Sequence, residues 1–203
     1  MTHSKRTKTF TLGLKLATDP SWVNIAEMSI EDILVDHAYC EQKATSSTIS
    51  LIVKFPEKEE LVEQLTPIVA EEWHHFKLVM DELRKRGLRL GMRRADRYVK
   101  ALQSIVKTGG TRDDQLLEKL LVGALIEARS CERFRLLWKY LDDQVLRDFY
   151  HEMMVAEAGH YKLYLRLANL YLPAEMVEYR WRELLAQEAD IMNVLPPRHD
   201  RLH

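Results

Sequence analysis

The stretch IVAEEWHHFKLV, residues 68–79, holds two overlapping Glu-x-x-His pairs, Glu71 with His74 and Glu72 with His75. A helix turns just one of these pairs toward a buried core, because residues three and four apart share a face. Steps of three and four residues through Glu72 and His75 meet apolar residues, whereas the same steps through Glu71 and His74 meet mostly polar ones. The sequence therefore predicts that Glu72 and His75 interrupt an apolar seam. Its apolar members are Leu61, Leu65, Ile68, Val79 and Leu83.

A second segment repeats this pattern. Residues 142–171 contain an apolar seam interrupted by Glu157 and His160, which again have the Glu-x-x-His spacing. The recurrence matters because one such pair arises easily by chance, whereas two pairs that both face a core do not. The apolar members of this second seam are Leu146, Tyr150, Met153, Tyr164 and Leu167.

Two further helical segments each place one glutamate, Glu41 or Glu127, on an otherwise apolar seam. Glu41 precedes Glu72 by 31 residues, and Glu127 precedes Glu157 by 30. This spacing indicates an internal duplication of one helical hairpin. Two antiparallel hairpins of similar loop length would bring these side chains to a common depth in a bundle.

The composition favours helices over strands, with 46% apolar and 30% charged residues and only 7 Gly and 6 Pro among 203 residues. Four of the expected helices are long, and the longest connection separates the second from the third. This pattern predicts an all-α, ferritin-like four-helix bundle with additional shorter helices and one crossover. The length predicts one domain over residues 1–203, with a lead-in over 1–20 and a loose tail over 193–203. The expected helices cover residues 30–53, 57–86, 88–107, 113–140, 142–171 and 174–192.

Four glutamates and two histidines in an apolar core need compensation, since buried charges persist only when they are paired or bound to metal. Two divalent cations would balance the four carboxylates. Ligands of carboxylate and imidazole without thiolate suit iron or manganese better than a structural zinc site. The alternative is a set of buried polar pairs bonded to neighbouring helices. The predicted metal ligands are Glu41, Glu72, His75, Glu127, Glu157 and His160.

Net charge is −1, with 30 basic and 31 acidic residues, yet the basic residues are unevenly placed. The stretch RKRGLRLGMRRADRYVK, residues 84–100, has eight basic side chains and a single acid, Asp96. Such runs are often solvated surfaces. Because eight positive charges cannot be neutralised by one acid, we expect the run to bind phosphates.

The cysteines and the apolar segments indicate the compartment in which we expect the protein. The cysteines Cys40 and Cys131 lie far apart in the sequence, which predicts free thiols in a reducing compartment. No segment has the apolar length of a signal peptide or a membrane span, so we expect a cytoplasmic protein with no membrane association.

Several residues near the predicted ligands have two interpretations. His37 lies one turn before Glu41 and would either hold that carboxylate or be an ordinary core histidine. Tyr164 and Cys131 would either serve the metals or simply pack. Glu132 lies on a different stripe from Glu127, and we expect it to form a salt bridge with Arg129 or Arg135.

Beyond the metal pattern, the chain resembles the tRNA 2-methylthio-isopentenyladenosine hydroxylase (MiaE) family along nearly its whole length. The resemblance rests on LVDHAYCEQKA (34–44), AEEWHHF (70–76), RRADRYVKAL (93–102), ALIEARSCERF (124–134) and AEAGHYKLY (156–164). Ferritin-like di-iron proteins in general share the glutamates and histidines, whereas the residues around them are distinctive of this family. The segments DHAYCEQKA and IEARSCERF are the most distinctive.

The resemblance implies a non-haem di-iron monooxygenase that uses O2 to hydroxylate the isopentenyl group of a hypermodified adenosine beside the tRNA anticodon. It implies that two iron ions are held by the six predicted ligands, that an unidentified donor supplies electrons, and that the anticodon stem-loop binds nearby. The protein itself would be a monomer or a weak homo-oligomer. The tRNA-binding candidates are Arg84, Arg86, Arg89, Arg93, Arg94 and Arg97.

Two other classes of function compete with this one. A ferritin-like ferroxidase or peroxide reductase would use the same six ligands without nucleic acid, but it predicts a cage or a rubredoxin-type cysteine site, and two cysteines exclude the latter. A metal-free helical RNA-binding module would leave four core carboxylates uncompensated. Metal content separates this last class from the others.

Overall fold

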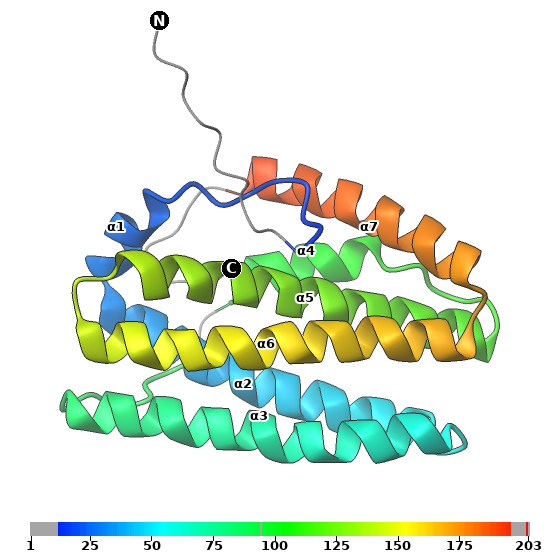
Figure 1. Ribbon diagram of the computed structural model, residues 1–203, viewed down its shortest axis with the longest axis horizontal. Helices are drawn as coiled ribbons and strands as arrows, with labels where there is room; N and C mark the ends of the chain where they lie inside the picture. The colour runs from blue at the N-terminus through cyan, green and yellow to red at the C-terminus, as the bar shows by residue number, and fades with distance from the viewer. Residues whose placement is uncertain (1–11, 94, 196–201, 203) are drawn as a thin grey trace, which may run out of the picture.

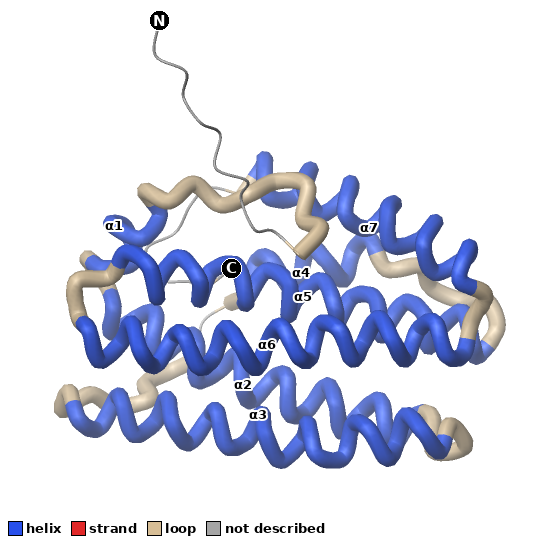
Figure 2. The backbone as a smooth tube through the Cα atoms, in the orientation of Figure 1, coloured by secondary structure: helices blue, strands red, loops and turns tan. Residues whose placement is uncertain are grey.

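The computed structural model describes residues 12–93, 95–195 and 202. These residues form helices and no strand, which confirms the all-α prediction (Figures 1 and 2). The four long helices begin and end within two residues of the predicted boundaries. The helices are α1 (Trp22–Glu27), α2 (Ile30–Lys54), α3 (Glu59–Lys85), α4 (Arg97–Ile105), α5 (Arg112–Tyr140), α6 (Gln144–Tyr171) and α7 (Ala174–Val194).

Local sequence signals fix where the long helices of the second hairpin start. Thr111 and Asp114 form a capping box, in which each side chain accepts a hydrogen bond from the backbone N–H of the other. Asp143 caps α6 by accepting from the backbone N–H groups of Val145 and Leu146. The connection between α5 and α6 is therefore only three residues long, which forces the two helices to run antiparallel.

The four long helices form two hairpins, α2 with α3 and α5 with α6, that pack into a ferritin-like bundle (Figure 1). The crossover between α3 and α5 includes α4. The short helix α4 packs against α7, and α7 lies over α5 on the side opposite α3 (Figure 1). Among the described helices, none is long and apolar enough to span a membrane.

The apolar core consists of two separate clusters, one toward each end of the bundle. One cluster takes Leu51 from α2 and residues up to Ile68 from α3, and the other takes residues up to Ala38 from α2 and Val79 and Leu83 from α3. The second hairpin divides in the same way. On α2, α3 and α6 the predicted metal ligands therefore lie between the two clusters, and on α5 Glu127 lies at the inner edge of the first cluster, so the bundle is apolar at both ends and polar in the middle.

The segment 88–107, predicted as one crossing helix, is helical only from Arg97 onward, so this prediction was wrong for its first half. Gly87 and Gly91 adopt φ values of +70° and +65°, which end α3 and bend the chain. Two contacts with α2 hold the segment in place: the Tyr39 hydroxyl donates to the Gly91 carbonyl at 2.8 Å, and Lys43 pairs with Asp96. We call residues 87–93 and 95–96 the strap.

Three further features differ from the expectation or extend it. Helix α1 was not anticipated. Pro67 was expected to kink or restart its helix but lies inside α3, which continues through it. In the predicted loose tail, Leu202 is fully buried in a core cluster, and its backbone N–H donates to Asp36 at 3.0 Å. Residues 196–201 and 203 of the tail and 1–11 of the lead-in lie outside the described residues.

A buried ionic network ties the periphery to α5. The fully buried Arg129 guanidinium contacts Glu132, as predicted, and donates to Glu188 of α7 at 2.7 Å. It also donates to Thr18 Oγ1 and to the Leu16 carbonyl in the segment before α1. One side chain of α5 thus fastens both α7 and the N-terminal segment to the bundle.

Replacing Arg129 with Ala should lower the free energy of unfolding by about 3–5 kcal/mol, because the buried Glu132 and Glu188 would lose the arginine that they share as a charged partner. Denaturation with guanidinium chloride measures this change. The matched control is Arg182→Ala, which removes an exposed arginine 3.6 Å from Glu178 and should change stability by less than about 0.5 kcal/mol. Equal midpoints for the two variants would refute the role of Arg129.

Candidate metal centre

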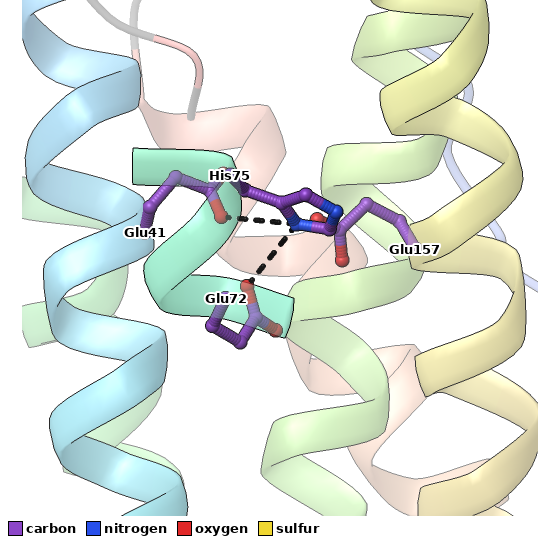
Figure 3. A group of neighbouring side chains, drawn as sticks. All are labelled: Glu41, Glu72, His75 and Glu157. Carbon is purple, nitrogen blue, oxygen red and sulfur yellow. Dashed lines mark ion pairs between the residues drawn. The ribbon is translucent and has the colours of Figure 1, made fainter. Parts of the chain in front are cut away.

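Six side chains from four helices meet in the polar layer between the two core clusters. All six are at most 6% exposed. They form two overlapping groups in which the possible ligand atoms lie within 4.8 Å of one another, and Glu72 and Glu157 belong to both. The first group is Glu41, Glu72, His75 and Glu157 (Figure 3), and the second is Glu72, Glu127, Glu157 and His160.

The two histidines approach the carboxylates in the same way. His75 turns Nδ1 toward Glu41 Oε2 at 3.6 Å and Glu72 Oε2 at 3.7 Å (Figure 3). His160 turns Nδ1 toward Glu72 Oε1 at 3.0 Å and Glu157 Oε2 at 3.5 Å. Glu72 therefore directs one oxygen toward each imidazole, as expected for a carboxylate between two related half-sites. His74, by contrast, is exposed, as the sequence predicted.

Several polar atoms of this cluster are buried without hydrogen-bond partners among the described residues. Their contacts with one another are too long or too poorly aligned for hydrogen bonds, and buried polar groups in proteins are almost always satisfied. Carboxylate and imidazole atoms that converge and remain unsatisfied are what a bound cation would complete. The residues present therefore fit a metal centre. The unsatisfied atoms include Glu41 Oε2, both Glu72 oxygens, His75 Nδ1, Glu157 Oε2 and His160 Nδ1.

The electrostatics of the cluster also call for positive charge. Burial raises the pKa values of Glu41 and Glu127 well above the ordinary value for a carboxyl group. Burial by itself would lower the pKa of His75, but its contacts with Glu41 and Glu72 outweigh that effect and raise the pKa to about 10. The protein interior thus resists negative charge on Glu41 and Glu127 and favours a proton on His75, unless other cations balance the carboxylates.

A cavity of about 510 Å³ joins the cluster to the surface. It opens between α2, α4 and α5 and is bounded at its inner end by the carboxylates of Glu41, Glu72, Glu127 and Glu157. Its lining combines small or apolar residues with polar and basic ones, and of these Tyr164 is buried whereas Arg93 and Gln103 are exposed. The small, apolar or aromatic residues include Ala44, Gly123, Ile126 and Tyr164, and the polar or basic ones include Tyr39, Lys43, Arg93 and Gln103.

Three residues near the cluster, for which the sequence allowed two interpretations, make specific contacts. His37 is fully buried against aromatic rings, and its Nε2 lies 2.8 Å from Glu41 Oε1. The Tyr164 hydroxyl lies 3.1 Å from Thr48 Oγ1, and its ring packs so closely on Gly123 that a Cβ there would stand 3.2 Å from it. Cys131 donates to the Met154 carbonyl at 3.3 Å. Tyr164 borders the cavity, and Cys131 does not.

The basic run is partly neutralised by acids of the preceding turn. Arg84 pairs with Asp81 at 2.5 Å, and Arg86 pairs with Glu82 at 2.6 Å and with Asp143 at 2.7 Å. The expectation that these charges lacked acidic partners was therefore wrong for this part of the run. The sequence held the signal, because Asp81 and Glu82 lie three and four residues before the arginines.

The remaining arginines of the run differ in position. Arg89, Arg93 and Arg97 are exposed, and Arg93 of the strap borders the cavity. Arg94 lies outside the described residues. The structure thus places one predicted phosphate-binding arginine at the opening that leads to the buried cluster.

Comparison with known proteins agrees with this geometry. The family model described as "tRNA-(MS[2]IO[6]A)-hydroxylase (MiaE)" matches residues 6–203. The chain belongs to the MiaE family. A Pseudomonas putida member, a tRNA 2-(methylsulfanyl)-N(6)-isopentenyladenosine(37) hydroxylase, is 38% identical over 154 residues, which cover 76% of this chain and 74% of that protein.

Two further relatives extend the comparison. The Salmonella typhimurium MiaE hydroxylase of the same name is 37% identical over 144 residues, which cover 71% of this chain but only 52% of that protein. A solved structure, "Protein 43 with aldehyde deformylating oxygenase activity from Synechococcus", superposes with a TM-score of 0.87 at 31% identity and covers 94% of each chain. This MiaE family chain therefore shares its fold, over 94% of its length, with a protein described as having oxygenase activity.

Metal binding should stabilise the protein. At a free Fe2+ concentration of about 100 times the dissociation constant, the melting temperature should rise by on the order of 5–10 °C, because only the folded state assembles the cluster. Differential scanning calorimetry under anaerobic conditions, with and without a chelator, measures the shift. Glu72→Ala, which removes the carboxylate common to both groups, should abolish it, and the exposed Glu63→Ala should not. A shift that persists in Glu72→Ala would place the metal elsewhere.

Proposed function

We propose that this protein is a di-iron monooxygenase that hydroxylates the isopentenyl group of 2-methylthio-N6-isopentenyladenosine in tRNA. The observation that carries the proposal is the cavity that runs from an arginine-bearing strap to a buried carboxylate and imidazole cluster. Family membership and the names of the relatives support the choice of substrate. The six residues that would hold the two irons are Glu41, Glu72, His75, Glu127, Glu157 and His160.

When bound, the di-iron centre supplies the activation of O2 needed to attack an unactivated C–H bond. In the balanced reaction, one oxygen atom enters the C–H bond to give an alcohol and the other leaves as water. Two electrons from an external redox protein and two protons complete the balance. The four carboxylates hold the negative charge that two iron ions require.

The chain's own residues give the cavity two chemically different ends. Ala44, Gly123 and Ile126 provide small or apolar walls next to the cluster, which suit the isopentenyl group. Tyr164, fixed by Thr48 and by its packing on Gly123, closes that end and excludes water. A cavity of about 510 Å³ lies within the range of roughly 300–1,000 Å³ that is usual for small-molecule sites.

The outer end suits the remainder of a nucleotide. Proteins that modify a base inside RNA take it out of the stack and bind it in a pocket, while basic side chains hold the adjoining phosphates. Arg93 at the cavity opening is placed for such a phosphate, and the exposed Arg89 and Arg97 flank it in the sequence. The anticodon stem-loop would then lie across the strap and α4. Arg84 and Arg86 are less suited because acids already engage them.

Hydroxylation is tested by nucleoside mass spectrometry. tRNA that carries the prenylated adenosine is incubated with iron-loaded protein, O2 and an electron donor, then digested. The expected result is a gain of one oxygen on that nucleoside in wild type and in Glu63→Ala, and none in Glu72→Ala. If wild type holds two irons and consumes O2 but leaves the nucleoside unchanged, the hydroxylase proposal fails, and a ferroxidase or peroxide reductase becomes the better assignment.

The strap is tested by charge reversal. Arg93→Glu should weaken tRNA binding at low salt and reduce the slope of log affinity against log salt concentration by about 1, because one phosphate contact is lost. Fluorescence anisotropy with a labelled anticodon stem-loop measures both quantities. Arg182→Glu, at an exposed position on α7 outside the cavity, makes the same charge change and serves as the control. Equal slopes for the two variants would contradict a phosphate contact at Arg93.

A further inference from the structure

Both histidines of the cluster turn their second ring nitrogen toward the same carboxylate. Glu71 Oε2 lies 3.3 Å from His160 Nε2, and Glu71 Oε1 lies 3.9 Å from His75 Nε2. Glu71 precedes Glu72 on α3 and belongs to neither candidate metal group. Its side chain is 44% exposed, so it covers the imidazoles on the side of the cluster that faces solvent. Each Glu71 oxygen thus has its own imidazole.

The chemistry of a ligating histidine makes this placement significant. An imidazole that offers the lone pair of Nδ1 to a metal carries its proton on Nε2, and an acceptor at Nε2 fixes that tautomer and the orientation of the ring. His160 Nε2 is buried, and within the described residues it has no hydrogen-bond partner of good geometry. Glu71 is the carboxylate that the structure places within 4 Å of this atom.

Glu71 of the first hairpin has no equivalent carboxylate in the second hairpin. The two hairpins carry equivalent Glu-x-x-His sequences, with Glu72 and His75 on α3 and Glu157 and His160 on α6. The residue before the first glutamate is Glu71, whereas the residue in the equivalent position on α6 is Ala156. A carboxylate at this position therefore comes from α3 alone, and it lies between the two histidines.

We propose that Glu71 is a positioning residue shared by both metal half-sites, with one oxygen accepting from His75 Nε2 and the other from His160 Nε2. The inference rests on the proposed metal centre, since it concerns how the two histidines are held for it. The His160 contact is already within hydrogen-bond distance, whereas the longer His75 contact requires the exposed Glu71 side chain to move toward that ring. Loss of the carboxylate then weakens both half-sites together.

The test is anaerobic titration with Fe2+ against a chromophoric chelator, which requires neither tRNA nor O2. Glu71→Ala should lower the affinity for both Fe2+ ions by about 10- to 100-fold, the usual effect of removing the partner of a ligating histidine. Glu71→Gln, which keeps the size and one oxygen acceptor, should fall between Glu71→Ala and wild type. Glu63→Ala, an exposed glutamate two turns earlier on α3, should bind as wild type does.

A spectroscopic measurement separates positioning from general destabilisation. In the Co2+-loaded protein, Glu71→Ala should shift the visible ligand-field bands, while the metal-free variant unfolds at the same denaturant concentration as Glu63→Ala. Unchanged affinity for either Fe2+ ion in Glu71→Ala, with unchanged Co2+ bands, would overturn the shared role. If wild type itself binds no Fe2+, the proposed function fails along with this inference, whereas wild-type binding of two ions with an unaffected Glu71→Ala overturns the inference alone.

Discussion

The burial of four carboxylates and two imidazoles between two apolar clusters is the constraint on which this structure depends. Desolvation penalises charge in this layer, and several polar atoms of the cluster have no hydrogen-bond partner among the described residues. Such a layer is compatible with a stable bundle when bound cations offset the desolvation cost of the charged groups and when apolar packing on both sides supplies stability. The two core clusters provide that packing, so the apolar ends of the bundle hold the hairpins together while the carboxylates and imidazoles lie in the middle.

The cluster has two unlike sides. On one side, the carboxylates of all four long helices border a cavity that also has polar and basic lining residues, among them the exposed Arg93. On the other, the imidazoles of α3 and α6 turn away from the cavity toward Glu71 and solvent. Glutamates from all four long helices thus line the cavity, whereas the two histidines, both on Glu-x-x-His helices, are absent from its lining. The cavity and Glu71 therefore lie on different sides of the cluster.

The crossover between the hairpins joins the fold to the proposed substrate site. Two glycines with positive φ release the chain from α3, and Tyr39 and Lys43 of α2 hold the strap near the opening of the cavity. The same two side chains border that cavity. The two side chains that hold the crossover in place therefore also line the cavity that a nucleotide would enter. This links the longest connection of the bundle to its proposed function.

The sequence by itself determined the long helices and which residues face inward, because apolar periodicity and local capping act within one helix. It therefore predicted that Glu72 and His75, rather than Glu71 and His74, lie in the core, and the matched spacing in the second hairpin extended this to Glu157 and His160. Only the tertiary structure decided what depends on contacts between distant segments: the extended strap, the burial of Leu202, the network around Arg129 and the cavity. The place of Glu71 shows the physical reason. Periodicity assigned it to the polar face of its own helix, while its contact with His160 arises from the packing of α3 beside α6.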